Sequence, residues 1–67
     1  MNRIPVISTN VSSIGYYNGI IEVEFNNGSI YHYYGTTEIL FNQFLNAPSK
    51  GRFIHYNLKG FNYRKVA

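Results

Sequence analysis

The residues of this sequence that could do chemistry gather in its last third, where cations stand beside aromatic rings. Five of the six Lys and Arg residues lie there, at Lys50, Arg52, Lys59, Arg64 and Lys65. The three acidic residues, all glutamates, come earlier in the chain. Cations attract phosphate groups, and Tyr or His rings can stack on nucleic-acid bases. This asymmetry indicates an anionic partner, although ordinary solubilising charge has the same composition.

A helix expected over residues 50–58 divides these side chains from apolar ones. At about 100° per residue, its two sides differ in character. The packing side holds Phe53, Ile54, Asn57 and Leu58. The other side holds Arg52, His55, Tyr56 and Lys59. This basic and aromatic side has the residue types that bind single-stranded nucleic acid, and a plain solvated face would have them too.

The start of the same helix resembles an anion site. Ser49, Lys50, Gly51 and Arg52 bring free backbone N–H groups, a hydroxyl, two cations and a glycine that would let a phosphate approach the backbone. The pattern of a nucleotide-binding P-loop is absent. Ser49 acting only as the N-cap of the helix is the simpler interpretation.

Groups for catalysis or metal binding are sparse. The chain has no Cys and no Asp, and its only histidines are His32 and His55. No spacing supplies Ser49 with a base and an orienting carboxylate, and no apolar pocket is indicated for Glu22 and Glu24. We therefore expect a non-enzymatic protein without metal or cofactor, in which Glu22 and His32 form a cross-strand salt bridge.

Chain length and composition limit what can hold these residues in place. A chain of 67 residues forms one small domain, and without disulfides its seven Tyr and five Phe must supply much of the core. No apolar run approaches the roughly 20 residues of a membrane span, and the N-terminus lacks a signal-peptide pattern. The absence of Cys fits a reducing compartment. We expect a soluble cytoplasmic protein with no membrane partner.

Three β-rich runs follow one another and predict a meander. They are residues 11–17, 20–25 and 29–34. Asn18-Gly19 separates the first two runs and is the strongest short hairpin signal, because a type I′ turn needs positive φ at both positions. Asn26, Asn27 and Gly28 form the second turn. Residues 61–66 indicate a short terminal strand or a tail.

The register of the second hairpin decides where the tyrosines point. A type I turn with Gly28 in the left-handed position of a bulge pairs Val23 with Tyr31 and sends Tyr31 and Tyr33 to the core face. A two-residue Asn27-Gly28 turn slips the pairing by one residue and turns both rings outward. The bulged form is favoured, because the alternative buries a histidine and exposes two large aromatic rings.

The helices complete an α+β fold. Thr36 is the expected N-cap of the first helix, which has Glu38 in its first turn and ends at Ala47-Pro48. The second helix follows, and Gly60 ends it. We predict an antiparallel three- to four-stranded β-meander packed with two short helices, as a single domain over residues 1–67.

The outer face of this sheet gathers an apolar strip, which a monomer would tend to cover. Its members are Tyr17, Ile20, Ile30 and Tyr34. Self-association or a protein partner would cover it, and so would the terminal strand or residues 3–7 lying across it. Tyr17, Ile20 and Tyr34 are the candidate interface residues.

The order of motifs resembles one known family. Y-x-Y at Tyr31 and Tyr33, then a helix, then A-P-S-K-G-R-F over residues 47–53 is similar to the KTSC domain family, over most of the chain. Members occur as small stand-alone proteins in bacteria and phages and at the C-terminus of some lysyl-tRNA synthetases. The resemblance implies a non-enzymatic module for which RNA binding has been suggested. Its motif residues correspond to Tyr31, Tyr33, Ser49, Lys50, Gly51, Arg52 and Phe53.

Two functional hypotheses follow from these patterns. The first is a module that binds RNA or another phosphate-bearing ligand. Its residues are Ser49, Lys50, Gly51, Arg52, His55, Tyr56 and Lys59, with charge added by Arg64 and Lys65. The second is a protein-interaction module or homo-oligomer, such as a phage-encoded inhibitor of a host factor, that uses the apolar strip.

Overall fold

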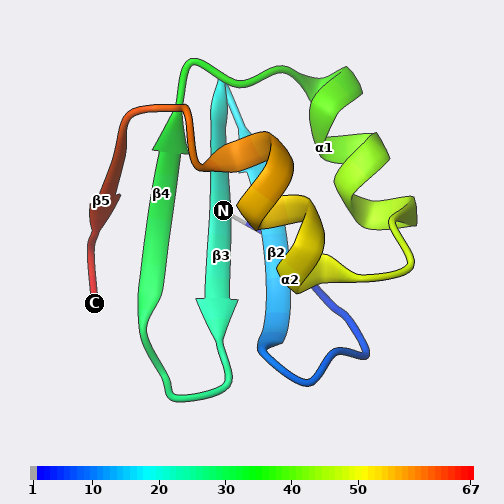
Figure 1. Ribbon diagram of the computed structural model, residues 1–67. Coiled ribbons are helices and arrows are strands. Elements are labelled where there is room, and N and C mark those ends of the chain that lie inside the picture. Colours follow the sequence, from blue (N-terminus) through cyan, green and yellow to red (C-terminus); the bar gives the residue numbers. More distant parts are fainter. Residues whose placement is uncertain (1) are drawn as a thin grey trace.

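The computed structural model describes residues 2–67 and contains one antiparallel sheet, in which each strand pairs with the next along the chain (Figure 1). The strands are β1 (Arg3–Pro5), β2 (Val11–Tyr17), β3 (Ile20–Phe25), β4 (Ile30–Tyr34) and β5 (Tyr63–Lys65). The α+β class and the meander are as expected. The strand number is five rather than three or four, because β1 was missed. A three-residue strand that contains a proline is too short to show an alternating pattern.

The two turns have the geometry that their residue types require. Asn18 and Gly19 have φ of 48° and 83°, as a type I′ turn needs. Gly28 has φ of 90°, and its N–H donates to the Phe25 carbonyl over 2.9 Å. Val23 consequently pairs with Tyr31. The bulged register is therefore confirmed, and the tyrosine pair of the second hairpin lies on the inner face of the sheet.

Helix α1 (Glu38–Asn46) begins one residue later than expected. Its N-cap is Thr37, whose hydroxyl accepts a hydrogen bond from the Leu40 N–H over 3.1 Å. The assignment of Thr36 as N-cap was wrong. Thr36 is buried, and both its hydroxyl and its backbone N–H donate to the Gly19 carbonyl over 2.9 Å. Thr36 thus holds the segment between β4 and α1 against the first hairpin. The sequence alone does not show which of the two adjacent threonines makes this tertiary contact.

The second helical segment changes its hydrogen bonding partway. Ser49 caps α2 (Lys50–Phe53), as expected, and accepts a hydrogen bond from the Arg52 N–H over 3.2 Å. The segment continues as the π-helix η1 (Ile54–Leu58), with Lys59 N–H donating to the Ile54 carbonyl over 3.0 Å. We expected an uninterrupted α-helix, but helix propensities do not distinguish the two bonding patterns. Single π turns are often found at functional sites.

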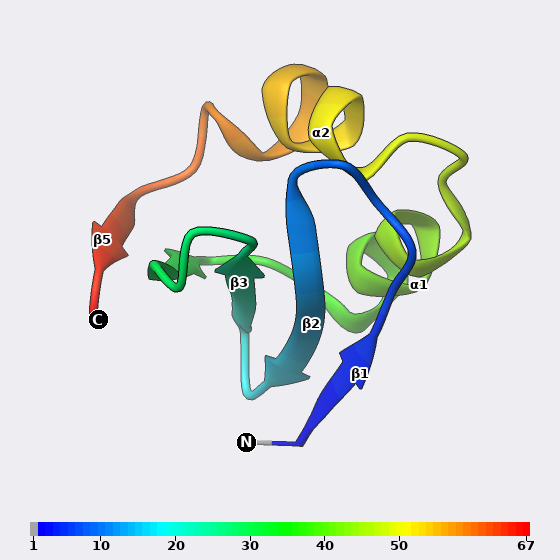
Figure 2. The ribbon, with the colours of Figure 1, turned by 90° about the horizontal axis from the view of Figure 1, so that it is seen from below.

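Both helical segments lie on one face of the sheet. In Figure 1, the second helical segment crosses in front of β2 and β3, and α1 lies beside β2, whereas β4 and β5 have no helix in front of them. The view from below (Figure 2) shows α2 above β2 and β3, with β5 at the far edge. The core between them consists of Val11, Ile14, Ile21, Val23, Tyr33, Phe41, Phe44 and Leu58. No helix in residues 2–67 is long and apolar enough to cross a membrane.

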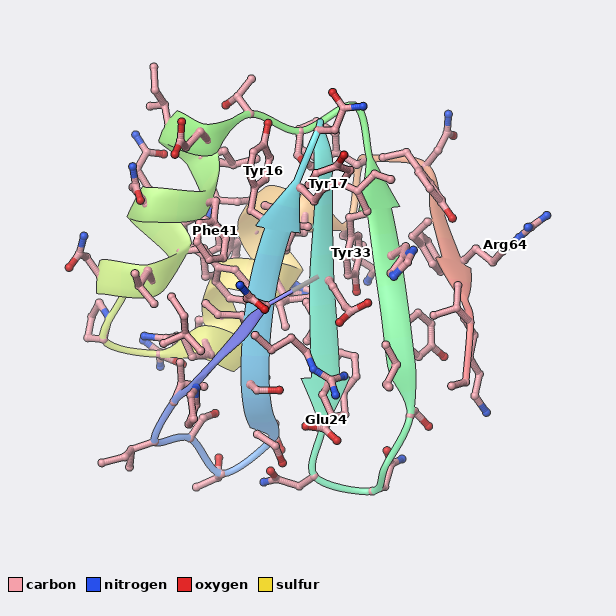
Figure 3. All side chains as sticks on the ribbon, turned by 180° about the vertical axis from the view of Figure 1, so that it is seen from behind. Tyr16, Tyr17, Glu24, Tyr33, Phe41 and Arg64 are labelled. Atoms are coloured by element: carbon pink, nitrogen blue, oxygen red, sulfur yellow. The ribbon has the colours of Figure 1, made fainter. Side chains whose placement is uncertain are left out.

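The two terminal strands lie at opposite edges of the sheet, and Figure 3 shows the N-terminal segment passing over the outer side of β2. Strand β1 pairs with β2, and β5 pairs with β4, so both extend the sheet at its edges. The covering by the terminal strand was therefore wrong, whereas Arg3 of the N-terminal segment reaches the outer face and contacts Glu22 over 3.4 Å. Strand β5 satisfies its backbone hydrogen bonds by pairing with the edge of β4, which packing across the face would not do.

Candidate ligand-binding surface

Four side chains of the second helical segment form an exposed surface of cations and rings. We call it the basic helix face, and it consists of Arg52, His55, Tyr56 and Lys59. All four are exposed, and Tyr56 keeps 77% of its surface accessible. The His55 and Tyr56 rings meet edge to face, with centroids 4.9 Å apart. The structure therefore brings together these four predicted ligand-binding residues.

No carboxylate neutralises the basic helix face. Among residues 2–67, ion pairs occur only at Glu22, which lies 3.4 Å from Arg3 and 2.7 Å from His32. The pairing of Glu22 with His32 confirms the expected cross-strand contact. The other two glutamates form no ion pair in the described chain. Arg52 and Lys59 therefore present unpaired charge to solvent.

Lys50 lies outside this surface, although we grouped it with the cations. It is only 9% exposed, and its ammonium group donates to the Ala47 carbonyl over 2.5 Å. A sequence signal for this burial exists. Lys50 precedes Phe53 by three residues and Ile54 by four, which places it on the packing side of the helix. The Lys50 ammonium group therefore stabilises the connection between α1 and α2 and does not face solvent.

Much of the run at residues 47–53 is explained by packing. Ser49 caps the helix, and Phe53 stacks on Phe44 with centroids 4.9 Å apart. A Cβ on Gly51 would lie 3.0 Å from the side-chain nitrogen of Asn10, so the glycine allows the loop to approach α2. Arg52 is exposed and makes no such contact.

The last two basic residues point to opposite faces of the sheet. Arg64 pairs with His32 on the outer face, and Figure 3 shows its side chain extending away from the sheet. Lys65 pairs with Tyr31 on the inner face. The nine predicted ligand-binding residues therefore do not form one surface, and Arg64 lies on the side of the sheet opposite the helices.

Sequence reasoning missed two clefts beside α2. The larger, of about 540 Å³, lies between α2, the β3–β4 turn and the loop before β2. Its walls include Phe25, Tyr31 and Ile54, with Asn10, Asn27 and Ser29 at its polar side. The smaller, of about 420 Å³, lies between residues 7–10 and the start of α2. The only hint in the sequence was that Tyr31 and Gly51, which both line the larger cleft, stand in the two motifs.

A row of aromatic rings continues from the larger cleft along the inner sheet face. Phe25 meets Tyr31 edge to face at 5.5 Å, and Tyr63 lies 6.2 Å from Tyr31 and 5.7 Å from Tyr33. Burial raises the pKa of Tyr33 above its usual value, and the neighbouring Tyr31 and Tyr63 raise it further. Tyr63 remains 57% exposed, so one end of the row faces solvent.

The candidate interface residues share one end of the outer sheet face. Ile20 pairs with Tyr17 on one side and with Tyr34 on the other. Tyr17 is 66% exposed, whereas Ile20 and Tyr34 are half-buried. Figure 3 shows Tyr17 on this outer face, near the turn that joins β2 and β3.

No group of three or more His, Cys, Asp or Glu side chains that could hold a metal occurs in residues 2–67.

Comparison with known proteins points to the family that the sequence resembles. The model of the KTSC domain matches residues 7–63. The crystal structure of a KTSC domain protein from Yersinia pestis superposes with a TM-score of 0.92 at 39% identity, covering 98% of this chain and 97% of that one. Among curated proteins, none matches the chain.

Proposed function

The chain belongs to the KTSC domain family, and we propose that this member is a non-enzymatic binding module whose basic helix face holds RNA or another phosphate-bearing ligand. The observation that carries the proposal is the unpaired exposure of Arg52 and Lys59 beside the His55 and Tyr56 rings. Cations without a carboxylate partner can neutralise phosphates without first breaking an ion pair. A reducing cytoplasm, where RNA is present, suits a chain without cysteine.

The same arrangement favours binding without strong sequence preference. Phosphate contacts position a nucleic acid but do not read its bases, and an exposed ring can stack on any base. The absence of a catalytic arrangement also supports a binding role. The Ser49 hydroxyl accepts the helix-cap hydrogen bond, and no base or carboxylate contacts it within the described chain.

Charge reversals on the two faces of the molecule test this proposal. Arg52→Glu and Arg64→Glu change the net charge equally, but only Arg52 belongs to the basic helix face. Affinity for a fluorescein-labelled single-stranded RNA is measured by anisotropy at a series of salt concentrations. Each phosphate contact contributes a slope of about −0.7 to the dependence of log affinity on log salt. We expect Arg52→Glu to weaken binding and reduce the slope by about this amount.

Arg64→Glu should leave the salt dependence close to that of the wild type, because its side chain lies on the outer sheet face. Lys59→Glu should behave as Arg52→Glu does. Equal losses in all three variants would mean that only net charge matters and would refute a specific basic helix face. Wild-type protein that fails to bind the RNA and inorganic phosphate alike would refute the proposal altogether.

A protein-interaction role through Tyr17, Ile20 and Tyr34 is the second candidate, as a homo-oligomer or as an inhibitor of a host factor. The observation in its favour is that these side chains are adjacent across three strands and that Tyr17 keeps 66% of its surface exposed. Light scattering at a series of dilutions measures self-association. A mass that rises with concentration and returns to the monomer value in Tyr34→Glu would support it. A monomer at every concentration would refute the homo-oligomer hypothesis.

A further inference from the structure

The larger cleft beside α2 has the volume of a small-molecule site. Its volume of about 540 Å³ falls within the range of about 300–1,000 Å³ that such sites have. The inner sheet face contributes Phe25 and Tyr31, α2 and η1 contribute Gly51 and Ile54, and the loop before β2 contributes Asn10. Three segments distant in sequence therefore converge on one cleft.

The walls of this cleft combine rings with neutral hydrogen-bonding groups. None of its lining side chains carries a charge. Tyr31 is half-buried, with its ring held edge to face against Phe25 at 5.5 Å. Neither the Tyr31 hydroxyl nor the side-chain amide of Asn10 makes a hydrogen bond within the described chain. These groups are free to bond a ligand.

The loop that carries Asn10 is held in place by other residues. The side-chain amide nitrogen of Asn26 donates to the Thr9 carbonyl over 2.8 Å, and its amide oxygen accepts a hydrogen bond from the Ser12 hydroxyl over 2.6 Å. The Asn26 N–H also donates to the Asn10 carbonyl over 2.9 Å. On the helix side, Gly51 leaves room for the Asn10 amide, which a Cβ would meet at 3.0 Å. The Asn10 amide is therefore positioned at the cleft by a fixed backbone and a close glycine.

We propose that this cleft receives one nucleobase of a bound single-stranded RNA, and this inference rests on the proposed function. An asparagine amide donates and accepts side by side, which matches the paired donor and acceptor on the edge of a base. The Tyr31 ring supplies an aromatic surface for the planar base. The uncharged walls disfavour a phosphate inside the cleft.

Groups that can contact the phosphates lie near the cleft. His55, on the basic helix face, follows Gly51 by one helical turn. Lys65 lies opposite Tyr31 on the inner sheet face, beside the aromatic row. A strand whose base enters the cleft can therefore pass its backbone between the basic helix face and the edge of the sheet. This division assigns base contact to Tyr31 and Asn10 and phosphate contact to the cations.

The test compares RNA with an oligomer that lacks bases. The probes are a fluorescein-labelled oligoadenylate, an oligouridylate and a ribose–phosphate oligomer of the same length without bases. One stacked base strengthens binding about 5-fold to 150-fold, so at least one base-bearing probe should exceed the abasic probe by this factor. Asn10→Ala removes the paired hydrogen bonds but keeps the Tyr31 ring, so it should reduce the preference for base-bearing probes and leave abasic binding unchanged. Arg52→Glu should weaken all three probes together.

Two variants keep the result interpretable. Gly51→Ala should act as Asn10→Ala does, because its Cβ displaces the amide. Asn10 makes no side-chain hydrogen bond in the described chain, so Asn10→Ala should melt as the wild type does even if Gly51→Ala is less stable. Equal wild-type affinity for all probes, or an Asn10→Ala variant with the full wild-type preference for bases, overturns the cleft while the proposed function stands. Failure of every probe to bind overturns both.

Discussion

Lys50 and Arg52 offer a sharp separation of stability from binding. The two cations are two residues apart in α2, and replacing either by Met removes one positive charge from the protein. Lys50 is 9% exposed and donates to the Ala47 carbonyl, whereas Arg52 is exposed and faces solvent. We therefore expect Lys50→Met to affect mainly folding and Arg52→Met to affect mainly binding.

The structure sets the size of the folding effect. Methionine keeps an unbranched apolar stem, so Lys50→Met leaves no large cavity and mainly removes one hydrogen bond from a charged donor. Such a bond is worth about 1.5–3 kcal/mol. In a domain of this length each kcal/mol shifts the melting temperature by about 4–8 °C, so the variant should melt about 6–24 °C below the wild type. Arg52→Met should change the free energy of unfolding by no more than about 0.5 kcal/mol.

Thermal unfolding followed by circular dichroism measures the first effect, and anisotropy with labelled single-stranded RNA, at a temperature where both variants are folded, measures the second. Lys50→Met should keep wild-type affinity and Arg52→Met should lose affinity. The reverse pattern, with Lys50→Met stable but unable to bind, would show that Lys50 contacts the ligand and that its burial has been misread.

Three further substitutions test the fold that positions the site. Gly28→Ala should cost about 1–2 kcal/mol in chemical denaturation, because Gly28 has φ of 90° with open space around it, whereas Gly60→Ala should cost little. Thr37→Ala should cost about 1 kcal/mol through loss of the α1 cap, and no loss would contradict the assigned cap. Burial raises the folded-state pKa of Tyr33 above 10.0, so the unfolded chain loses this proton first and stability falls as pH rises from there through the folded-state pKa. Tyr33→Phe should therefore lose less stability than the wild type in alkaline denaturation, and identical pH profiles would contradict the assignment.

Features that depend on local residue types could be predicted from the sequence. Turn chemistry at Asn18-Gly19 fixes the register of the first hairpin, because only certain residues tolerate positive φ. At the second turn Gly28 allowed two registers, and the preference for burying the tyrosines selected the one that the structure has. Once the registers are set, the alternation of side chains assigns each strand residue to a face. The inward position of Tyr31 and the contact of His32 with Glu22 followed directly from this. The exposure of the basic helix face likewise followed from helical periodicity.

Features that depend on distant contacts could not be predicted in this way. Strand β1 is recognisable only by its pairing with β2. Thr37 rather than Thr36 caps α1, because Thr36 forms a hydrogen bond with the first hairpin. The larger cleft needs the approach of the loop at Asn10, the β3–β4 turn and α2, which no local pattern describes. The burial of Lys50 could have been predicted from its spacing to Phe53. It was not, because a lysine is expected to be exposed and able to bind an anion.

Binding of RNA at the basic helix face is tested most directly by a nuclear magnetic resonance titration of the labelled protein with a short single-stranded RNA. We expect the largest shifts in backbone amide and side-chain signals at Arg52, His55, Tyr56 and Lys59. Signals of the outer sheet face, including Arg64 and Tyr17, should remain in place. Shifts confined to the outer sheet face, or none at RNA concentrations that exceed those of the protein, would contradict the claim that the basic helix face binds RNA.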